Sequence, residues 1–184
     1  MRGLPPGLLM NQLTPEKLKG KKPGPGPIEY DVEKDAAASA YIATIDGERQ
    51  LYIPAYALYN MILGTAMRYK EKGKRTSISY LLAGTIRVEP EKMPLGHCNY
   101  EIDLRPVRVP PRTGARVLRS RALVTEWDAY PAIVYNKNVL PSNIGETMNA
   151  ILIDGGIRTG LLDYRPAKKG PYGTFEVPEF EIPE

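Results

Sequence analysis

The sequence predicts a single α+β domain, residues 1–184, in which helices pack on one face of an antiparallel sheet. Two segments with apolar residues at helical spacing lie among several short segments with strand-like alternation. Helices and strands do not alternate strictly, as they would in a Rossmann sheet, and no repeat at a solenoid period is present. With 184 residues, 42% hydrophobic and 25% charged, the chain is long enough for one hydrophobic core.

The first third of the chain predicts a short strand, a basic arm and a hairpin. Residues 4–13 are apolar but interrupted by prolines, which predicts a short strand. Residues 17–27, KLKGKKPGPGP, predict a flexible basic arm or loop, because lysine, glycine and proline bury too little surface to become ordered. This arm can be a plain linker, or it can lie along a nucleic-acid backbone or reach a neighbouring subunit. Residues 40–53 predict a β-hairpin, with Asp46 and Gly47 at its tight turn.

A helix should follow Pro54. Its apolar stripe has helical spacing and consists of Ala55, Leu58, Tyr59, Ile62, Leu63 and Ala66. Cations follow at and beyond its C-terminal end, at Arg68, Lys70, Lys72, Lys74 and Arg75. They complement the helix dipole, or alternatively form a patch that contacts phosphate. A short second helix is expected over residues 77–83, ended by Gly84.

The second half of the chain predicts several strands and one long helix. Strands are expected at residues 85–88, 100–104, 116–124 and 127–135, with a turn at 90–94 and a polar loop at 106–116. Asn143, followed three residues later by Glu146, is typical of a helix N-cap with a capping box. That helix should pass into a glycine-rich basic loop, residues 155–173, which closes on a strand at 174–177.

Arginines are concentrated in the two strands and the connecting loop of the expected central hairpin. The net charge is only +4, but six arginines fall in this region: Arg105, Arg108, Arg112, Arg116, Arg119 and Arg121. Arg119 and Arg121 should share one strand face. A basic ribbon of this kind would neutralise phosphates, giving sequence-independent and salt-sensitive binding. Alternatively, the arginines pair with acids of a neighbouring subunit, such as Glu101, Asp103, Glu126 or the acidic tail 176–184.

The glycine-rich loop is the second candidate region. Its glycines can adopt positive φ and allow a ligand to approach the main chain, while its cations attract phosphate and its tyrosines offer faces for base stacking. The candidate side chains are Arg158, Tyr164, Arg165, Lys168, Lys169 and Tyr172. Asp163 should pair with Arg158 or Arg165 and hold the shape of the loop. The alternative is an ordinary helix end followed by turns, with lysines that are merely exposed.

The sequence carries no motif for a nucleotide-binding loop, a zinc protease or a serine hydrolase. One cysteine, Cys98, and one histidine, His97, can form neither an intrachain disulfide nor a Cys/His zinc site. We therefore expect no metal, no cofactor and no catalytic residue, and a cytoplasmic protein without a membrane span. His97 is expected to be an ordinary loop residue, with general-base catalysis of metal-independent RNA cleavage as an alternative.

Residues 46–69, DGERQLYIPAYALYNMILGTAMRY, resemble the hairpin-then-helix block of the RAMP superfamily, ferredoxin-like proteins that form the backbones of CRISPR effector complexes. Ile53 and Pro54 match that pattern, whereas Ala55 and Tyr56 stand where the family usually has Gly-Ser. The glycine loop before the last strand is a second similarity, which implicates Gly156, Arg158, Gly160, Lys168, Lys169, Gly170 and Gly173 near an RNA backbone. The chain also resembles phage-type proteins that share the ending GLLDYRP…GPYGTFEV.

The RAMP resemblance implies a ferredoxin-like or RRM-like sheet, single-strand binding and repeated subunits along the strand. The leading hypothesis is thus a non-enzymatic protein that binds single-stranded DNA or RNA and forms a homo-oligomer along it. A phage or mobile-element origin would point to replication or recombination. The first alternative is a structural self-assembly protein whose basic hairpin and acidic tail form subunit contacts. The second alternative is a metal-independent ribonuclease that uses His97, tyrosines and Lys168 or Lys169.

Overall fold

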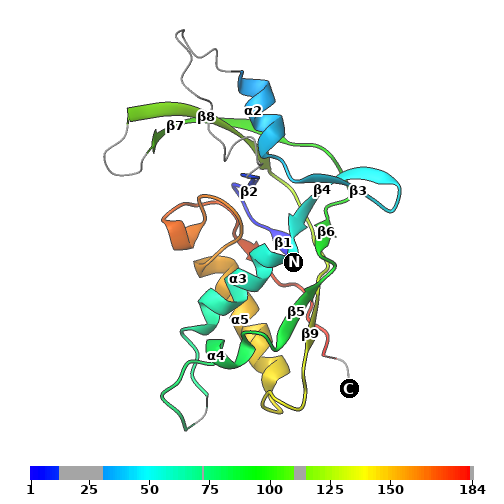
Figure 1. Ribbon diagram of the computed structural model, residues 1–184, viewed down its shortest axis with the longest axis vertical. Coiled ribbons are helices and arrows are strands. Elements are labelled where there is room, and N and C mark those ends of the chain that lie inside the picture. The colour runs from blue at the N-terminus through cyan, green and yellow to red at the C-terminus, as the bar shows by residue number, and fades with distance from the viewer. Residues whose placement is uncertain (13–30, 72, 110–114, 183–184) are drawn as a thin grey trace.

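The computed structural model describes residues 1–12, 31–71, 73–109 and 115–182, with side chains of 108, 109 and 115–117 excepted. Helices and antiparallel strands are mixed along the chain, which confirms the α+β prediction. The molecule is elongated, with the β7–β8 pair and α2 at one end and α4, β5 and β9 toward the other (Figure 1). The predicted arm at residues 17–27 lies outside the described residues.

The described strands form four small antiparallel sheets in place of the expected single sheet. β1 (Arg2–Gly3) pairs with β10 (Phe175–Glu176), and β5 (Ile86–Glu89) pairs with β9 (Ala132–Tyr135). A third sheet has the strand order β2 (Leu8–Leu9), β8 (Ala115–Val124), β7 (Glu101–Val109). The fourth has the order β3 (Ile42–Ile45), β4 (Glu48–Pro54), β6 (Lys92–Pro94). Prolines limit the length of the β4–β6 pairing. Pro54 and Pro94 lie at the two ends of this pairing, and a proline has no N–H with which to extend the ladder.

The first hairpin forms as the sequence predicts. β3 and β4 are joined at Asp46 and Gly47, whose φ values are 53° and 85°. Two consecutive residues at positive φ match the twist of antiparallel strands, and Asp-Gly tolerates this conformation well. Residues 92–94, expected to be part of a turn, instead form β6 beside β4.

Helix α3 (Ala55–Ala66) begins directly after Pro54, as predicted, and buries Leu58 and Met61. Helix α4 is confined to Ser79–Leu82. Helix α2 (Val32–Ser39) was not predicted, because its sequence VEKDAAAS has no apolar stripe and buries only Ala36 and Ser39. Its local signal is an N-cap: the Asp31 carboxylate accepts a 2.9 Å hydrogen bond from the backbone N–H of Lys34.

The central hairpin is longer than predicted. Most of the expected loop at 106–116 belongs to β7 and β8, whose register pairs Arg108 with Arg116 and Val109 with Ala115. Pro106 is tolerated because β7 is an edge strand of its sheet. Helix α2 packs against the hairpin, since the Ser120 hydroxyl donates to the carbonyl of Val32 at 2.7 Å. The hairpin is thus a two-stranded ribbon packed against α2, and most of residues 106–116 are not the polar loop that the sequence predicts.

Helix α5 (Ile144–Arg158) begins after Asn143, the predicted N-cap position, but Asn143 makes no side-chain capping bond. The helix continues through Gly155 and Gly156, so the prediction that these glycines begin the loop is wrong. A Cβ at Gly155 would overlap the Met61 sulfur of α3, and one at Gly156 would overlap the carbonyl oxygen of Phe175. Both glycines therefore permit close packing against α5.

Buried apolar side chains from all parts of the described chain meet in one core. Its members come from the N-terminal strands, the hairpins, the helices and the last strand, and include Leu8, Met10, Ile53, Leu58, Met61, Val124, Trp127, Ile151 and Phe175. The N-terminus is held to the later chain by backbone bonds from Gly3 to Trp127 and from Leu4 to Thr174. Within the described residues, no helix has both the length and the apolar character needed to cross a membrane.

Candidate nucleic-acid interface

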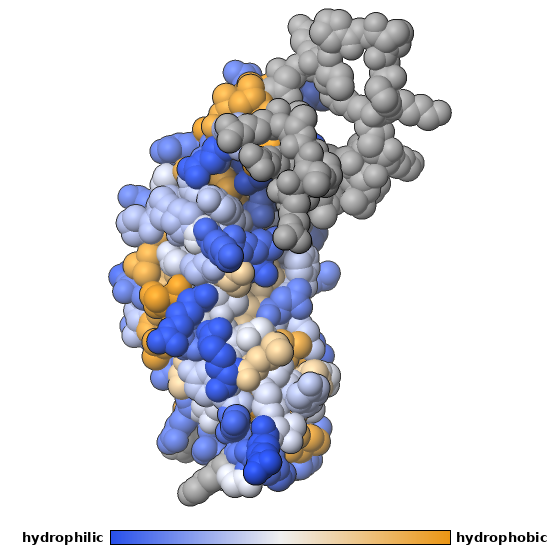
Figure 2. All heavy atoms as spheres, turned by 90° about the vertical axis from the view of Figure 1, so that its left-hand side faces the viewer, coloured by the Kyte–Doolittle hydropathy of each residue, from blue (hydrophilic) through white to orange (hydrophobic). Residues whose placement is uncertain are grey.

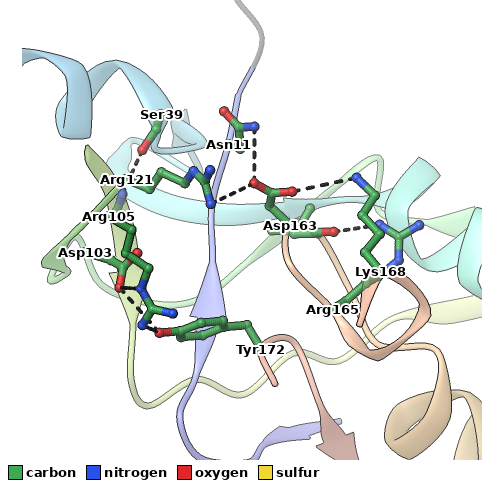
Figure 3. A network of polar contacts seen from close by, with 11 residues as sticks. Asn11, Ser39, Asp103, Arg105, Arg121, Asp163, Arg165, Lys168 and Tyr172 are labelled. Atoms are coloured by element: carbon green, nitrogen blue, oxygen red, sulfur yellow. Dashed lines mark hydrogen bonds and ion pairs between the residues drawn. The ribbon is translucent and has the colours of Figure 1, made fainter. Parts of the chain in front are cut away.

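The structure brings the basic hairpin and the glycine loop together, although they lie far apart in the sequence. We call the side chains of Arg105, Arg119, Arg121, Arg165, Lys168 and Lys169 the basic surface. The guanidinium of Arg105 donates to the Tyr172 hydroxyl and lies 4.9 Å from the centroid of that ring. Figure 3 shows this link beside a second one, centred on Asp163. The two predicted regions thus contact each other and make up one candidate site.

Asp163 joins the loop to the hairpin and to the N-terminal segment. One carboxylate oxygen lies 3.1 Å from Arg121 Nη1 and accepts a 3.3 Å bond from the Asn11 amide (Figure 3). The other lies 3.7 Å from Lys168 Nζ. The predicted pairing of Asp163 with Arg158 or Arg165 is therefore not observed. Arg158 is part of α5 and pairs with Asp154 one turn earlier.

Asp103 and Tyr172 form the second link. Arg105 Nε lies 2.7 Å from Asp103 Oδ1, and the Tyr172 hydroxyl also approaches this oxygen, at 3.4 Å. Tyr172 is only 3% exposed, and its ring centroid lies 6.1 Å from that of Tyr164. Tyr172 therefore stabilises the loop and has no free face for a base in this structure. Tyr164 is 40% exposed and does retain an accessible ring.

The loop glycines approach the protein's own main chain. Gly160 and Gly173 have φ values of 68° and 72°, which favour glycine. A Cβ at Gly170 would overlap the carbonyl oxygen of Tyr164, and one at Gly173 would overlap that of Leu161. Gly173 also donates a 2.8 Å backbone bond to Gly7. The space beside these glycines, which the sequence predicts to be open to a ligand, is filled by the chain itself.

The cations of the basic surface differ in how far they are engaged. Arg121 is largely buried by its pairing with Asp163, and Arg165 donates to the Leu162 carbonyl at 2.6 Å. Arg119 and Lys169 are exposed and make no ion pair with any described residue. These two side chains, together with the exposed Lys168, are the ones best placed to contact an anion.

The remaining predicted residues lie elsewhere or are not described. Arg158 and Arg68 share Asp154 on the exposed side of α5, so Arg158 is part of another cluster. Arg112 lies outside the described residues, and only the backbone of Arg108 and Arg116 is described, as paired positions of β7 and β8.

A cluster of tyrosines, which no motif in the sequence predicts, adjoins the basic surface. The hydroxyls of Tyr41 and Tyr56 are 2.8 Å apart, and the Tyr41 ring lies edge-on to Tyr52 at 5.7 Å. Burial, followed by the hydrogen bond with Tyr56, raises the pKa of Tyr41, to which the nearby Asp163 carboxylate also contributes. The available sequence signal was compositional: 12 tyrosines against two phenylalanines.

His97 lies at a separate cleft of about 520 Å³, which is also lined by Glu126 and Trp127. Its Nδ1 accepts a 3.2 Å bond from the backbone N–H of Asn99, and its Nε2 lies 3.3 Å from the carbonyl oxygen of Glu126. Both ring nitrogens are thus engaged by the main chain, which gives the ribonuclease alternative no support. No group of three or more metal-binding side chains occurs among the residues that the structure describes.

The side of the molecule that lies to the left in Figure 1 faces the viewer in Figure 2, and the coloured part of its surface is mostly hydrophilic. Figure 2 shows that hydrophobic side chains on this face form scattered groups and no continuous patch. A surface of this composition suits a polar partner better than an apolar protein interface.

Comparisons with protein-family models, with curated proteins and with solved structures find no match to this chain. The function must therefore be inferred from the site.

Proposed function

We propose that this protein binds single-stranded DNA or RNA through the basic surface and catalyses no reaction. The observation that carries the proposal is the convergence of the hairpin and the glycine loop on one site, joined through Asp163 and Tyr172. Six cations lie there against the two carboxylates of Asp103 and Asp163. The excess positive charge favours a polyanionic partner.

The internal ion pairs support this function by fixing the surface in advance. Asp163 of the loop pairs with Arg121 of the hairpin, and Arg105, held by Asp103 on its own strand, donates to the Tyr172 hydroxyl of the loop. The two segments therefore already have their relative position before a ligand arrives. A preformed site loses less conformational entropy on binding. Arg119 and Lys169, which have no ion-pair partner in the described part of the chain, are then available to donate charge-assisted hydrogen bonds to phosphate oxygens.

The ring of Tyr164 is exposed and lies 6.1 Å from the ring of Tyr172. Such a ring favours a single strand, whose bases can stack on aromatic side chains, over a duplex. In this proposal, copies of the chain line up along the strand within the cell, as the RAMP resemblance implies. The ferredoxin-like unit implied by that resemblance would be built around β3, β4 and α3, the block that carries the match.

Fluorescence anisotropy tests the proposal directly. Labelled single-stranded DNA, single-stranded RNA and duplex, each of about 20 nucleotides, would be titrated with the protein from about 50 to 200 mM salt. We expect binding to a single strand at low salt, with affinity falling steeply as salt increases. Absence of binding to either single strand at the lowest salt would contradict the proposal.

Self-assembly is the second candidate, and exposed apolar residues on the hairpin favour it. Ile102 and Leu104 on edge strand β7, and Leu118 on β8, are 43%, 46% and 50% exposed. An unpaired edge strand that carries apolar side chains can pair with a second copy. Sedimentation without nucleic acid distinguishes the candidates, because only a self-assembly protein should form large oligomers on its own.

A further inference from the structure

Tyr56 has an exposed aromatic ring whose hydroxyl is hydrogen-bonded to a buried tyrosine, Tyr41. It is the second residue of α3 and is 56% exposed, whereas its hydroxyl partner Tyr41 is only 8% exposed. Tyr41 is itself fixed, because its backbone N–H donates to the Met10 sulfur at 3.4 Å and its ring packs edge-on against Tyr52. Because its hydroxyl is already held by a buried partner, the anchor Tyr41, the Tyr56 ring should lose little conformational entropy when a ligand binds to it.

The anchor is stable over the physiological pH range. Burial raises the pKa of Tyr41, and the hydrogen bond with Tyr56 raises it further. Tyr41 therefore stays protonated and retains its hydroxyl bond to Tyr56 at neutral pH. The position of the Tyr56 ring should not depend on small changes in pH.

The tyrosines lie next to the basic surface. Met10, which contacts Tyr41, precedes Asn11, and the Asn11 amide donates to Asp163. The same Asp163 carboxylate is close enough to Tyr41 to contribute to its raised pKa, and it lies 3.7 Å from Lys168 Nζ. A strand whose phosphate contacts Lys168 would therefore pass near the tyrosines.

We propose that Tyr56 is a base-stacking site, on which one nucleobase of a bound single strand rests while a neighbouring phosphate contacts Lys168. This inference rests on the proposed function and adds to it a contact with a nucleobase of the bound strand. Stacking on an aromatic face is tolerant of sequence, because every base has a π-face. The site would thus strengthen binding without selecting a particular base.

Three variants test the stacking site by anisotropy with labelled oligothymidylate and oligouridylate over a salt series. Tyr56→Leu removes the ring, Tyr56→Phe keeps the ring but loses the hydroxyl, and Tyr80→Leu is a control at a 76% exposed tyrosine on α4. We expect Tyr56→Leu to lose affinity about 10-fold at every salt concentration. Tyr56→Phe should lose less, because it keeps the ring but not the hydroxyl bond to Tyr41, and Tyr80→Leu should bind like the wild type. The salt slope should be unchanged, because stacking releases no counterions.

The outcomes separate the two proposals. Wild-type binding with an equally tight Tyr56→Leu variant would overturn the stacking site and leave the proposed function standing. Failure of the wild-type protein to bind either oligonucleotide would overturn both. If Tyr56→Leu does not fold, photocrosslinking of the wild-type chain to iodouracil-substituted strands decides: a crosslink at Tyr56 supports stacking, and crosslinks confined to other residues overturn it.

Discussion

Two carboxylates determine which cations of the basic surface remain available. Asp163 pairs closely with Arg121, and Asp103 pairs with Arg105. Lys168 lies farther from Asp163, at 3.7 Å, and stays exposed, so it remains available together with Arg119 and Lys169. The sequence identifies the cations but not these partners, because an ion pair depends on which strands lie side by side. Asp163 was expected to pair within its own loop, yet Arg121 of β8 lies 3.1 Å away because the loop is bonded to the N-terminal segment beside that strand.

The tyrosines predict a loss of stability at alkaline pH. Burial is the largest cause of the raised pKa of Tyr41, Tyr52 and Tyr69. Above the ordinary tyrosine pKa of 10.0, the unfolded chain loses these protons while the folded chain retains them. The free energy of unfolding should therefore be unaffected by these groups below that pH, and should fall as the pH rises beyond it.

Urea unfolding from about pH 9 to about pH 11 measures this effect. Tyr41→Phe keeps the buried ring and removes the ionising hydroxyl, so the stability of this variant should fall less steeply than that of the wild type. Equal slopes for the two proteins would show that burial of Tyr41 does not disfavour its ionised form.

At the scale of helices and strands, the sequence predicts elements that have a clear periodicity. The β3–β4 hairpin and α3 were found because Asp46-Gly47 marks the turn and an apolar stripe follows Pro54. Helix α2 was missed because alanine and serine, not large apolar residues, form its buried face. The sequence predicts a loop at Gly155 and Gly156 because it does not show their packing partners on α3 and β10.

Two glycine substitutions test the packing of α3 on α5. A Cβ at Gly155 would overlap Met61, so Gly155→Ala should destabilise the protein by about 1–3 kcal/mol. Gly64 is within α3 and has nothing within 4 Å of the position of a Cβ, so Gly64→Ala should stabilise by about 0.5–1 kcal/mol. Urea denaturation measures both changes. A Gly155→Ala variant as stable as the wild type would mean that the helices are not in close contact there.

At the scale of the whole molecule, the α+β class could be predicted but the arrangement of strands could not. β1 and β10 pair the two ends of the chain, and β2 adds to the β7–β8 hairpin from more than a hundred residues away. Strands of two residues are too short to show an alternating pattern, so the local sequence does not predict them. These same pairings place the glycine loop beside the hairpin and thereby create the basic surface.

The central claim is that Arg119 and Lys169 contact the phosphates of a single strand. The most direct test compares the salt dependence of single-strand binding for the wild type, for Arg119→Ala/Lys169→Ala and for Lys70→Ala/Arg75→Ala. The last variant removes the same charge from exposed cations that follow α3, which the sequence also allowed as a phosphate-contacting patch.

We predict that the first double variant binds more weakly, with a slope of log K against log salt that is shallower by about 0.7 for each lost contact. The Lys70/Arg75 variant should retain the wild-type slope. Equal slopes for all three proteins, or a shallower slope in the Lys70/Arg75 variant alone, would contradict binding at the basic surface.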